Sequence, residues 1–168
     1  MSRSIILIIF FLLLLYSCST KDDPKVPNHS NGLTSAQNTM TFKNVTYNLA
    51  FRSCSTVDTF GTIHYMMTAG DVQAKFFVYF IFGDTTVPTS SSSYIIQNLA
   101  SVTSLLPGQC VVLLQDPFSA ALLKWTATDG IVNFTSTGKP QASLNNINVT
   151  CISDTSQHNI ISGNTQCP

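Results

Sequence analysis

Three histidines are the side chains of this chain that could act as a general base for a serine nucleophile. His29 lies in a polar stretch near the N-terminus, and His158 lies in a polar turn that also holds Asp154. His64 lies within a predicted strand beside Tyr65, where a structural histidine is the more frequent outcome. The pattern therefore indicates no catalytic triad, although a hydrolase with a histidine base stays an alternative.

The carboxylates form no recognisable acid–base pair. A glycosidase needs two carboxylates that face each other across a cleft. The chain has no glutamate, and turn chemistry explains most of its downstream aspartates, namely Asp58, Asp71, Asp84, Asp116, Asp129 and Asp154. Motifs for serine hydrolases, metalloproteases and phosphate loops are missing, and no cysteine spacing fits zinc. We expect no catalytic residue, no metal and no cofactor.

Cys18 is the residue whose context does support a specific chemistry. Arg3 precedes an apolar run from Ile5 to Leu15, which is too short to span a membrane but fits a signal peptide. The following residues, Leu15-Tyr16-Ser17-Cys18, resemble the bacterial lipobox, in which the cysteine sulfur receives diacylglycerol and the preceding peptide bond is cut. A multiply acylated cysteine anchors a protein stably, which one acyl chain does not. We expect a removed signal peptide over residues 1–17, with an ordinary secretory signal as the alternative.

The segment after Cys18 predicts where the protein is displayed. Lys21-Asp22-Asp23 resembles the export signal of surface-exposed lipoproteins in Bacteroidota, which implies an outer-membrane lipoprotein at the cell surface. Pro24, Pro27 and Gly32 lie among polar residues, a composition typical of flexible linkers. We therefore expect residues 18–38 to form a lipidated tether and residues 39–168 to form a single domain.

Four cysteines remain when Cys18 is set aside. An even number in an exported chain predicts two disulfides among Cys54, Cys110, Cys151 and Cys167. Three pairings are possible, and we favour Cys54 with Cys110 and Cys151 with Cys167.

Composition predicts an all-β domain that does not bind nucleic acid. All eight acidic residues are aspartates, and strand and turn formers are frequent. Loss of Arg3 with the signal leaves seven basic residues against eight acidic ones, so the basic surface that nucleic acid requires is missing. We expect an antiparallel β-sandwich, with a closed β-barrel as the alternative.

The predicted strands are short and separated by turn residues. The clearest unit is a hairpin in which 123–128 and 131–136 flank Asp129-Gly130 and place Trp125 opposite Phe134. A second strand, 75–82, is apolar on both faces and is expected in the core. Further strands are predicted over 42–51 with a turn at Lys43-Asn44, over 62–68, over 110–114, over 142–152 with an irregularity near Asn145-Asn146, and over 158–167. Residues 94–106 fit a helix and a strand equally.

Aromatic residues are the sequence feature that favours binding, because they can stack on a sugar or anchor a partner. Trp125 falls on the apolar face of its predicted hairpin and is expected in the core. Phe118, beside Asp116-Pro117 in a predicted loop, is the expected exposed aromatic. Other aromatics that could stack on a sugar or anchor a partner are Tyr47, Phe51, Phe60, Tyr65, Tyr79 and Tyr94.

Residues 125–139 and 142–147 resemble the C-terminal half of small β-sandwich lipoproteins of unknown function in Bacteroidota. The resemblance implies a fold and a location. We expect a monomeric, non-enzymatic protein that is bound to the membrane through Cys18 and binds an extracellular glycan or protein. An inhibitor of an incoming hydrolase, similar to a lysozyme inhibitor, is a further alternative.

Overall fold

The computed structural model describes residues 38–116 and 125–168, and these ranges contain strands and no helix. The strands are β1 (Thr39–Phe42), β2 (Val45–Asn48), β3 (Phe51–Thr59), β4 (Thr62–Asp71), β5 (Phe76–Phe82), β6 (Ser92–Ile96), β7 (Gln109–Gln115), β8 (Trp125–Ala127), β9 (Ile131–Thr135), β10 (Gln141–Cys151) and β11 (His158–Gln166). The predicted all-β class is confirmed.

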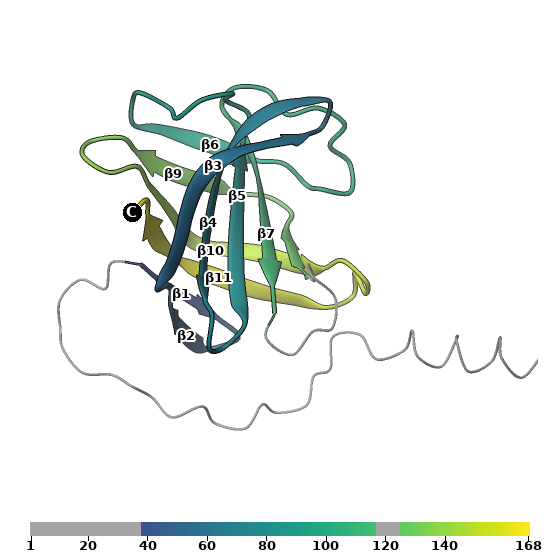
Figure 1. Cartoon of the computed structure of the whole chain (residues 1–168). Coiled ribbons are helices and arrows are strands. Elements are labelled where there is room, and N and C mark those ends of the chain that lie inside the picture. The colour runs from purple at the N-terminus through teal and green to yellow at the C-terminus, as the bar shows by residue number, and fades with distance from the viewer. Residues whose placement is uncertain (1–37, 117–124) are drawn as a thin grey trace, which may run out of the picture.

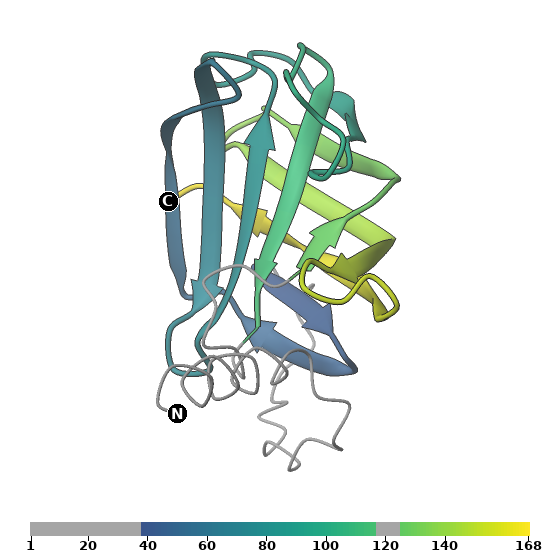
Figure 2. The ribbon, with the colours of Figure 1, turned by 90° about the vertical axis from the view of Figure 1, so that its right-hand side faces the viewer.

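All eleven strands belong to one sheet, in the order β2-β1-β11-β10-β9-β6-β7-β5-β4-β3, with β8 between β10 and β7. The pairing of β6 with β7 is parallel, and the other pairs are antiparallel. The sheet folds over so that β3, β4, β5 and β7 form one layer and β9, β10 and β11 cross behind it (Figure 1). Figure 2 shows the two layers facing each other. This arrangement is consistent with the predicted β-sandwich.

The main core lies between the two layers and is rich in aromatic rings. Phe82 contacts Phe134 edge to face across the layers, with centroids 5.4 Å apart, and Phe42 contacts Trp125 in the same way at 5.3 Å. Trp125 is buried, as the sequence predicts. Large rings bury much apolar surface per residue, so a few of them fill this space.

The hairpin predicted at Asp129-Gly130 does not form. β8 and β9 do not pair with each other, because both lie in line along the same edge of β10. Ala127 is opposite Val149 and Val132 is opposite Leu144, so the register is unchanged across the interruption. On the side away from β10, β8 pairs with β7 and β9 pairs with β6, so the neighbouring strand changes at Asp129-Gly130. Tertiary pairing along β10 therefore overrides the local turn signal.

Two predicted irregularities are confirmed. Lys43 and Asn44 have φ values of 51° and 59° and form the turn between β1 and β2. The register of β10 against β11 shifts between Leu144 and Ile147, where Asn146 has a φ of 51°. The ambiguous segment 94–106 contains the end of β6 and then irregular chain from residue 97, so it is neither a helix nor a continuous strand.

Candidate binding surface

The outer face of the β3–β4–β5–β7 layer carries partly exposed aromatic rings. Side chains alternate along a strand, and Cys54 and Val78 pack on the main core, so Phe51, Phe77 and Tyr79 point outward. We call these three residues the aromatic strip. Phe51 is 43% exposed, and its ring meets that of Phe77 edge to face with centroids 6.0 Å apart.

Gly70 makes this contact possible. It lies on β4 between Phe51 of β3 and Phe77 of β5 in the register of the sheet. A Cβ atom on Gly70 would overlap the Phe77 ring and approach the Phe76 carbonyl oxygen at 2.7 Å. The missing side chain therefore lets Phe77 lie over the backbone of β4 and reach Phe51.

The strip is flanked by neutral polar side chains. Tyr79 donates a hydrogen bond from its hydroxyl to Gln115 Oε1 at 3.4 Å. A phenol at its ordinary pKa is protonated at neutral pH and can donate, and partial burial raises the pKa of Tyr79 further. Ser53 and Thr68 are register partners on the same face, and both are half-buried. The surface thus combines aromatic area with hydroxyl and amide groups.

The other half of this outer face is covered by chain. Residues 97–107, which we call the cover segment, run between β6 and β7. Leu99, Val102 and Leu105 of this segment pack on a second apolar cluster. The sheet residues in that cluster are Val57, Met66, Tyr79, Ile81, Val111 and Leu113. Tyr79 belongs to both groups, so the strip continues this apolar face beyond the part that residues 97–107 cover.

His64 lies under the covered half and is completely buried. Neither of its ring nitrogens has a hydrogen-bond partner among the described residues. Phe60 contacts its ring edge to face, with centroids 6.1 Å apart. No Asp or Ser is bonded to this ring in the described structure, so His64 does not form the base of a triad there. His158 instead lies 3.1 Å from the Thr150 hydroxyl through its Nδ1.

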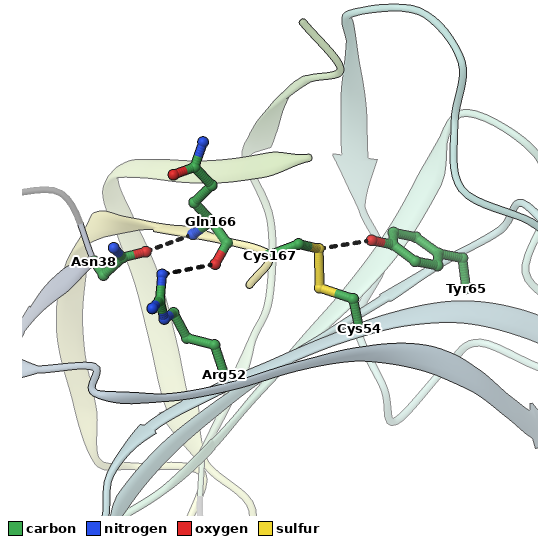
Figure 3. Close-up of a disulfide and its surroundings, with 6 residues drawn as sticks. All are labelled: Asn38, Arg52, Cys54, Tyr65, Gln166 and Cys167. Carbon is green, nitrogen blue, oxygen red and sulfur yellow. Dashed lines mark hydrogen bonds between the residues drawn. A yellow bond between two sulfur atoms is a disulfide. The ribbon is translucent and has the colours of Figure 1, made fainter. Parts of the chain in front are cut away.

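The disulfide of the described structure joins Cys54 of β3 to Cys167 (Figure 3). The predicted pairings of Cys54 with Cys110 and of Cys151 with Cys167 are therefore wrong. Cys110 is a free thiol in the main core, and burial raises its pKa strongly. Sequence spacing could not predict this pairing. The folded sheet brings β3, the strand at one end of the sheet order, next to the C-terminal end of β11.

Hydrogen bonds surround this disulfide. The Tyr65 hydroxyl lies 3.1 Å from Cys167 Sγ, and Arg52 donates to the Gln166 carbonyl oxygen at 3.5 Å. Asn38 Oδ1 accepts from the backbone N–H of Gln166 at 2.7 Å (Figure 3). We call this group the terminal clasp, because it ties the start of the described domain, β3 and the C-terminal residues together.

A buried ion pair lies at the opposite end of β7 from the cover segment. The Asp116 carboxylate is 2% exposed, and its Oδ2 is 3.1 Å from Lys43 Nζ. The same oxygen accepts from Trp125 Nε1 at 3.2 Å. Lys43 Nζ also lies 5.2 Å from the Trp125 ring centroid. The pair fixes the β1–β2 turn to the core.

Several predicted residues fall outside the described ranges. They are Cys18, Phe118 and His29, together with the predicted signal peptide and most of the predicted tether. Within the described ranges, no three metal-ligating side chains gather, and no helix has the length and apolar character needed to cross a membrane.

The sequence partly indicated the strip. Phe51 and Tyr79 stand among the aromatics that could stack on a ligand, but the sequence pattern predicts two buried faces for the strand that holds Phe77. The alternation within β5 gives the missing signal, since Phe77 and Tyr79 are half-buried while Phe76, Val78 and Phe80 are fully buried.

No family model, curated protein or solved structure matches this chain.

Proposed function

We propose that this chain is a lipid-anchored protein of the outer membrane, displayed at the cell surface, whose β-domain binds an extracellular glycan without catalysis. The observation that carries the binding proposal is the exposed Phe51 ring held against Phe77 on the outer face of the β3–β4–β5–β7 layer. Exposed rings fixed in one orientation lose little entropy when a ligand stacks on them.

The chemistry around the strip favours a glycan. Ser53, Thr68 and Gln115 offer hydroxyl and amide groups of the kind that orient a neutral polar ligand. Arg52 and Asp58 alternate with the outward residues of β3, so their side chains point to the other side of the strand. The three residues of the strip are themselves uncharged, which suits stacking on a neutral sugar.

The size of the strip also favours a glycan over a protein. A stable protein interface buries about 800 Å² on each partner. Three rings, of which Tyr79 and Phe77 are half-buried, provide much less area than this. A short run of sugar units matches such a surface better.

The anchoring part of the proposal is supported by the sequence around Cys18, which resembles a lipobox, and by Lys21-Asp22-Asp23. The described domain begins at Asn38, whose backbone N–H donates to Asn164 Oδ1 at 2.9 Å. A tether attached at Asn38 would therefore join the domain at a residue that is hydrogen-bonded to β11.

The binding proposal is tested by screening the purified full-length protein, in detergent, on an array of neutral glycans. Phe51→Ala should weaken binding of the selected glycan roughly tenfold, because a stacking contact contributes about 0.5–1.5 kcal/mol beyond its area. Gly70→Ala should also weaken binding, since its new methyl group displaces Phe77.

Ile160→Ala is the matched control, because Ile160 is 52% exposed on β11 of the other layer. It should bind as the wild type does. Equal affinity of Phe51→Ala and the wild type would contradict the assignment of the strip. Binding of protein ligands alone, with no glycan retained, would favour a protein partner.

A further inference from the structure

β3 is a sheet edge whose outer side is open in the described structure. It stands at one end of the sheet order and pairs with β4, and Figure 2 shows it as the outermost strand of its layer. Among residues 38–116 and 125–168, no backbone hydrogen bond joins β3 to a strand or loop other than β4. An open edge can pair with a further strand. We propose that this further strand is β3 of a second copy, so that two molecules of this protein share one continuous sheet.

The sequence of β3 is complementary in charge to itself when two copies run antiparallel. In a two-fold symmetric pair, the central residue of the strand is opposite its own copy. Ser55 is the middle residue of the nine in β3. With Ser55 at the centre, Arg52 of each copy is opposite Asp58 of the other copy. Opposite charges in opposed positions stabilise a pair of strands, whereas like charges destabilise it.

Neighbouring symmetric registers lose this match. A centre at Thr56 puts Arg52 opposite Phe60, and a centre one residue before Ser55 puts Asp58 opposite a residue that precedes β3. The register centred on Ser55 pairs all nine residues of the strand and also both charges. Charge complementarity and strand length therefore select the same register.

Arg52 and Asp58 have no ionic partner within the described ranges, where the ion pair is that of Lys43 with Asp116. Arg52 donates from Nη1 to the Gln166 carbonyl oxygen at 3.5 Å, but its Nε is buried and has no hydrogen-bond partner among the described residues. Asp58 is exposed. Both side chains lie on the same side of β3, because both alternate with its outward residues. A second copy would therefore supply each of them with a counterion.

The remaining opposed positions also suit a pair of strands. They contain hydroxyl, small and β-branched side chains with one aromatic ring, a composition that favours strand pairing. These opposed pairs are Phe51 with Thr59, Ser53 with Val57, and Cys54 with Thr56. The disulfide from Cys54 to Cys167 holds β3 in place within each copy. An edge that is already fixed loses little entropy when it pairs.

Pairing would join the outer faces of the two β3–β4–β5–β7 layers. Opposed residues share a face of the sheet, so both aromatic strips would lie on one surface. The two Phe51 positions would be about 27 Å apart along the strands. If the strip binds a glycan as proposed, the dimer would hold a long glycan at two points. That consequence rests on the proposed function, but the pairing does not. The dimer replaces the monomer expected from the sequence.

Disulfide trapping in the purified full-length protein, in detergent, tests the pairing. Ser55→Cys should form an intermolecular disulfide under a copper oxidant, because opposed Cα atoms lie about 4.5–5.5 Å apart. The product should run as a dimer on a non-reducing gel and disappear when a thiol reductant is added. Ser53→Cys is the matched control on the same face, since its two copies would be about 13 Å apart along the strands. The wild type gives the background from the native cysteines.

Charge variants in the Ser55→Cys background test the register. Asp58→Arg opposes two positive charges and should cause loss of most of the cross-link, whereas Asp58→Arg with Arg52→Asp exchanges the charges and should restore it. Gly70→Ala, which disturbs the strip but not the edge of β3, should keep the cross-link, so this proposal and the proposed function can fail separately.

Equal cross-linking of Ser55→Cys and Ser53→Cys would overturn the proposal. A cross-link that Asp58→Arg leaves unchanged would overturn it as well. If the charge-exchanged variant fails to fold, the comparison of Ser55→Cys with Ser53→Cys still decides.

Discussion

Tyr65 places a phenol inside the terminal clasp, next to the disulfide. Burial raises its pKa to about 12 from the ordinary 10.0. Because the folded-state pKa lies above the unfolded one, the neutral phenol stabilises the fold fully below pH 10. That contribution is lost as the pH rises from 10 toward 12.

We expect the urea midpoint of the wild type to fall over this pH range more steeply than that of Tyr65→Phe, which has no phenol at this position. Phenolate absorbance of the folded protein should show the corresponding late-titrating group, and the variant should lack it. Identical alkaline profiles would contradict the burial of this hydroxyl.

Lys43 and Asp116 form a pair in which the carboxylate is the more deeply buried partner. Lys43→Met keeps an apolar stem near Phe42 and Trp125 but removes the ammonium group. It should lower the free energy of unfolding by about 2 kcal/mol, because the buried carboxylate loses its ion pair with the ammonium group.

Asp116→Asn in the Lys43→Met background should recover part of this loss, since the amide carries no charge and can still accept from Trp125 Nε1. Urea denaturation of the wild type, both single variants and the double variant measures the coupling. Additive effects would show that the two side chains do not interact energetically.

At the scale of elements, the disulfide between Cys54 and Cys167 links residues 113 positions apart. Closing so long a loop restricts the unfolded chain, and the chain-entropy estimate for such a loop is about 5 kcal/mol. Cys54→Ser with Cys167→Ser should therefore lower the free energy of unfolding by about this amount.

Cys110→Ala is the comparison variant, because it removes a sulfur from the core but no cross-link. Cys110→Ala should lower the free energy of unfolding by a smaller amount, about 1 kcal/mol, because it is a small truncation. Urea denaturation under non-reducing conditions measures both. Equal losses would mean that the cross-link contributes little beyond packing.

Sequence patterns predicted strands that alternate clearly between polar and apolar residues or that are strongly apolar. β9 alternates buried and exposed residues in perfect register, and β5 is strongly apolar. The sequence predicts no strand beyond Phe51, the first residue of β3, because Ser53, Ser55 and Thr56 give neither face an apolar pattern. β3 is an edge strand at one end of the sheet and buries few side chains, so core packing places few requirements on its sequence.

The Asp129-Gly130 prediction failed for a different reason. The dipeptide favours a tight turn, but Trp125 and Thr126 pair with β10 and β7 instead of with β9. The long-range pairing that decides this is invisible in a local window. For the same reason the aromatic strip needed the structure, since Phe51, Gly70 and Phe77 come from three strands.

At the scale of the whole molecule, the proposed anchor makes a direct prediction. Mass spectrometry of the protein from membranes should find a mature chain that begins at Cys18 and carries acyl groups. Cys18→Ser should move the protein from the membrane fraction to the soluble fraction. The domain should remain folded, as a circular dichroism spectrum of strand type would show.

An intact residue 17–18 peptide bond in the mature protein would contradict the anchor. So would a disulfide between Cys18 and Cys151, because it would use the sulfur that the lipid requires. Peptide mapping without reduction distinguishes these outcomes in one experiment.

The terminal clasp has a mechanical consequence for a protein held at its N-terminal end. Asn38 is bonded to β11 residues Asn164 and Gln166, and the next residue, Cys167, is covalently joined to β3. Force that reaches Asn38 from a moving ligand or from flow would pass into strands of both layers at once. The domain should therefore resist being peeled open from its attachment point, and a pulling experiment in reducing buffer should find it weaker.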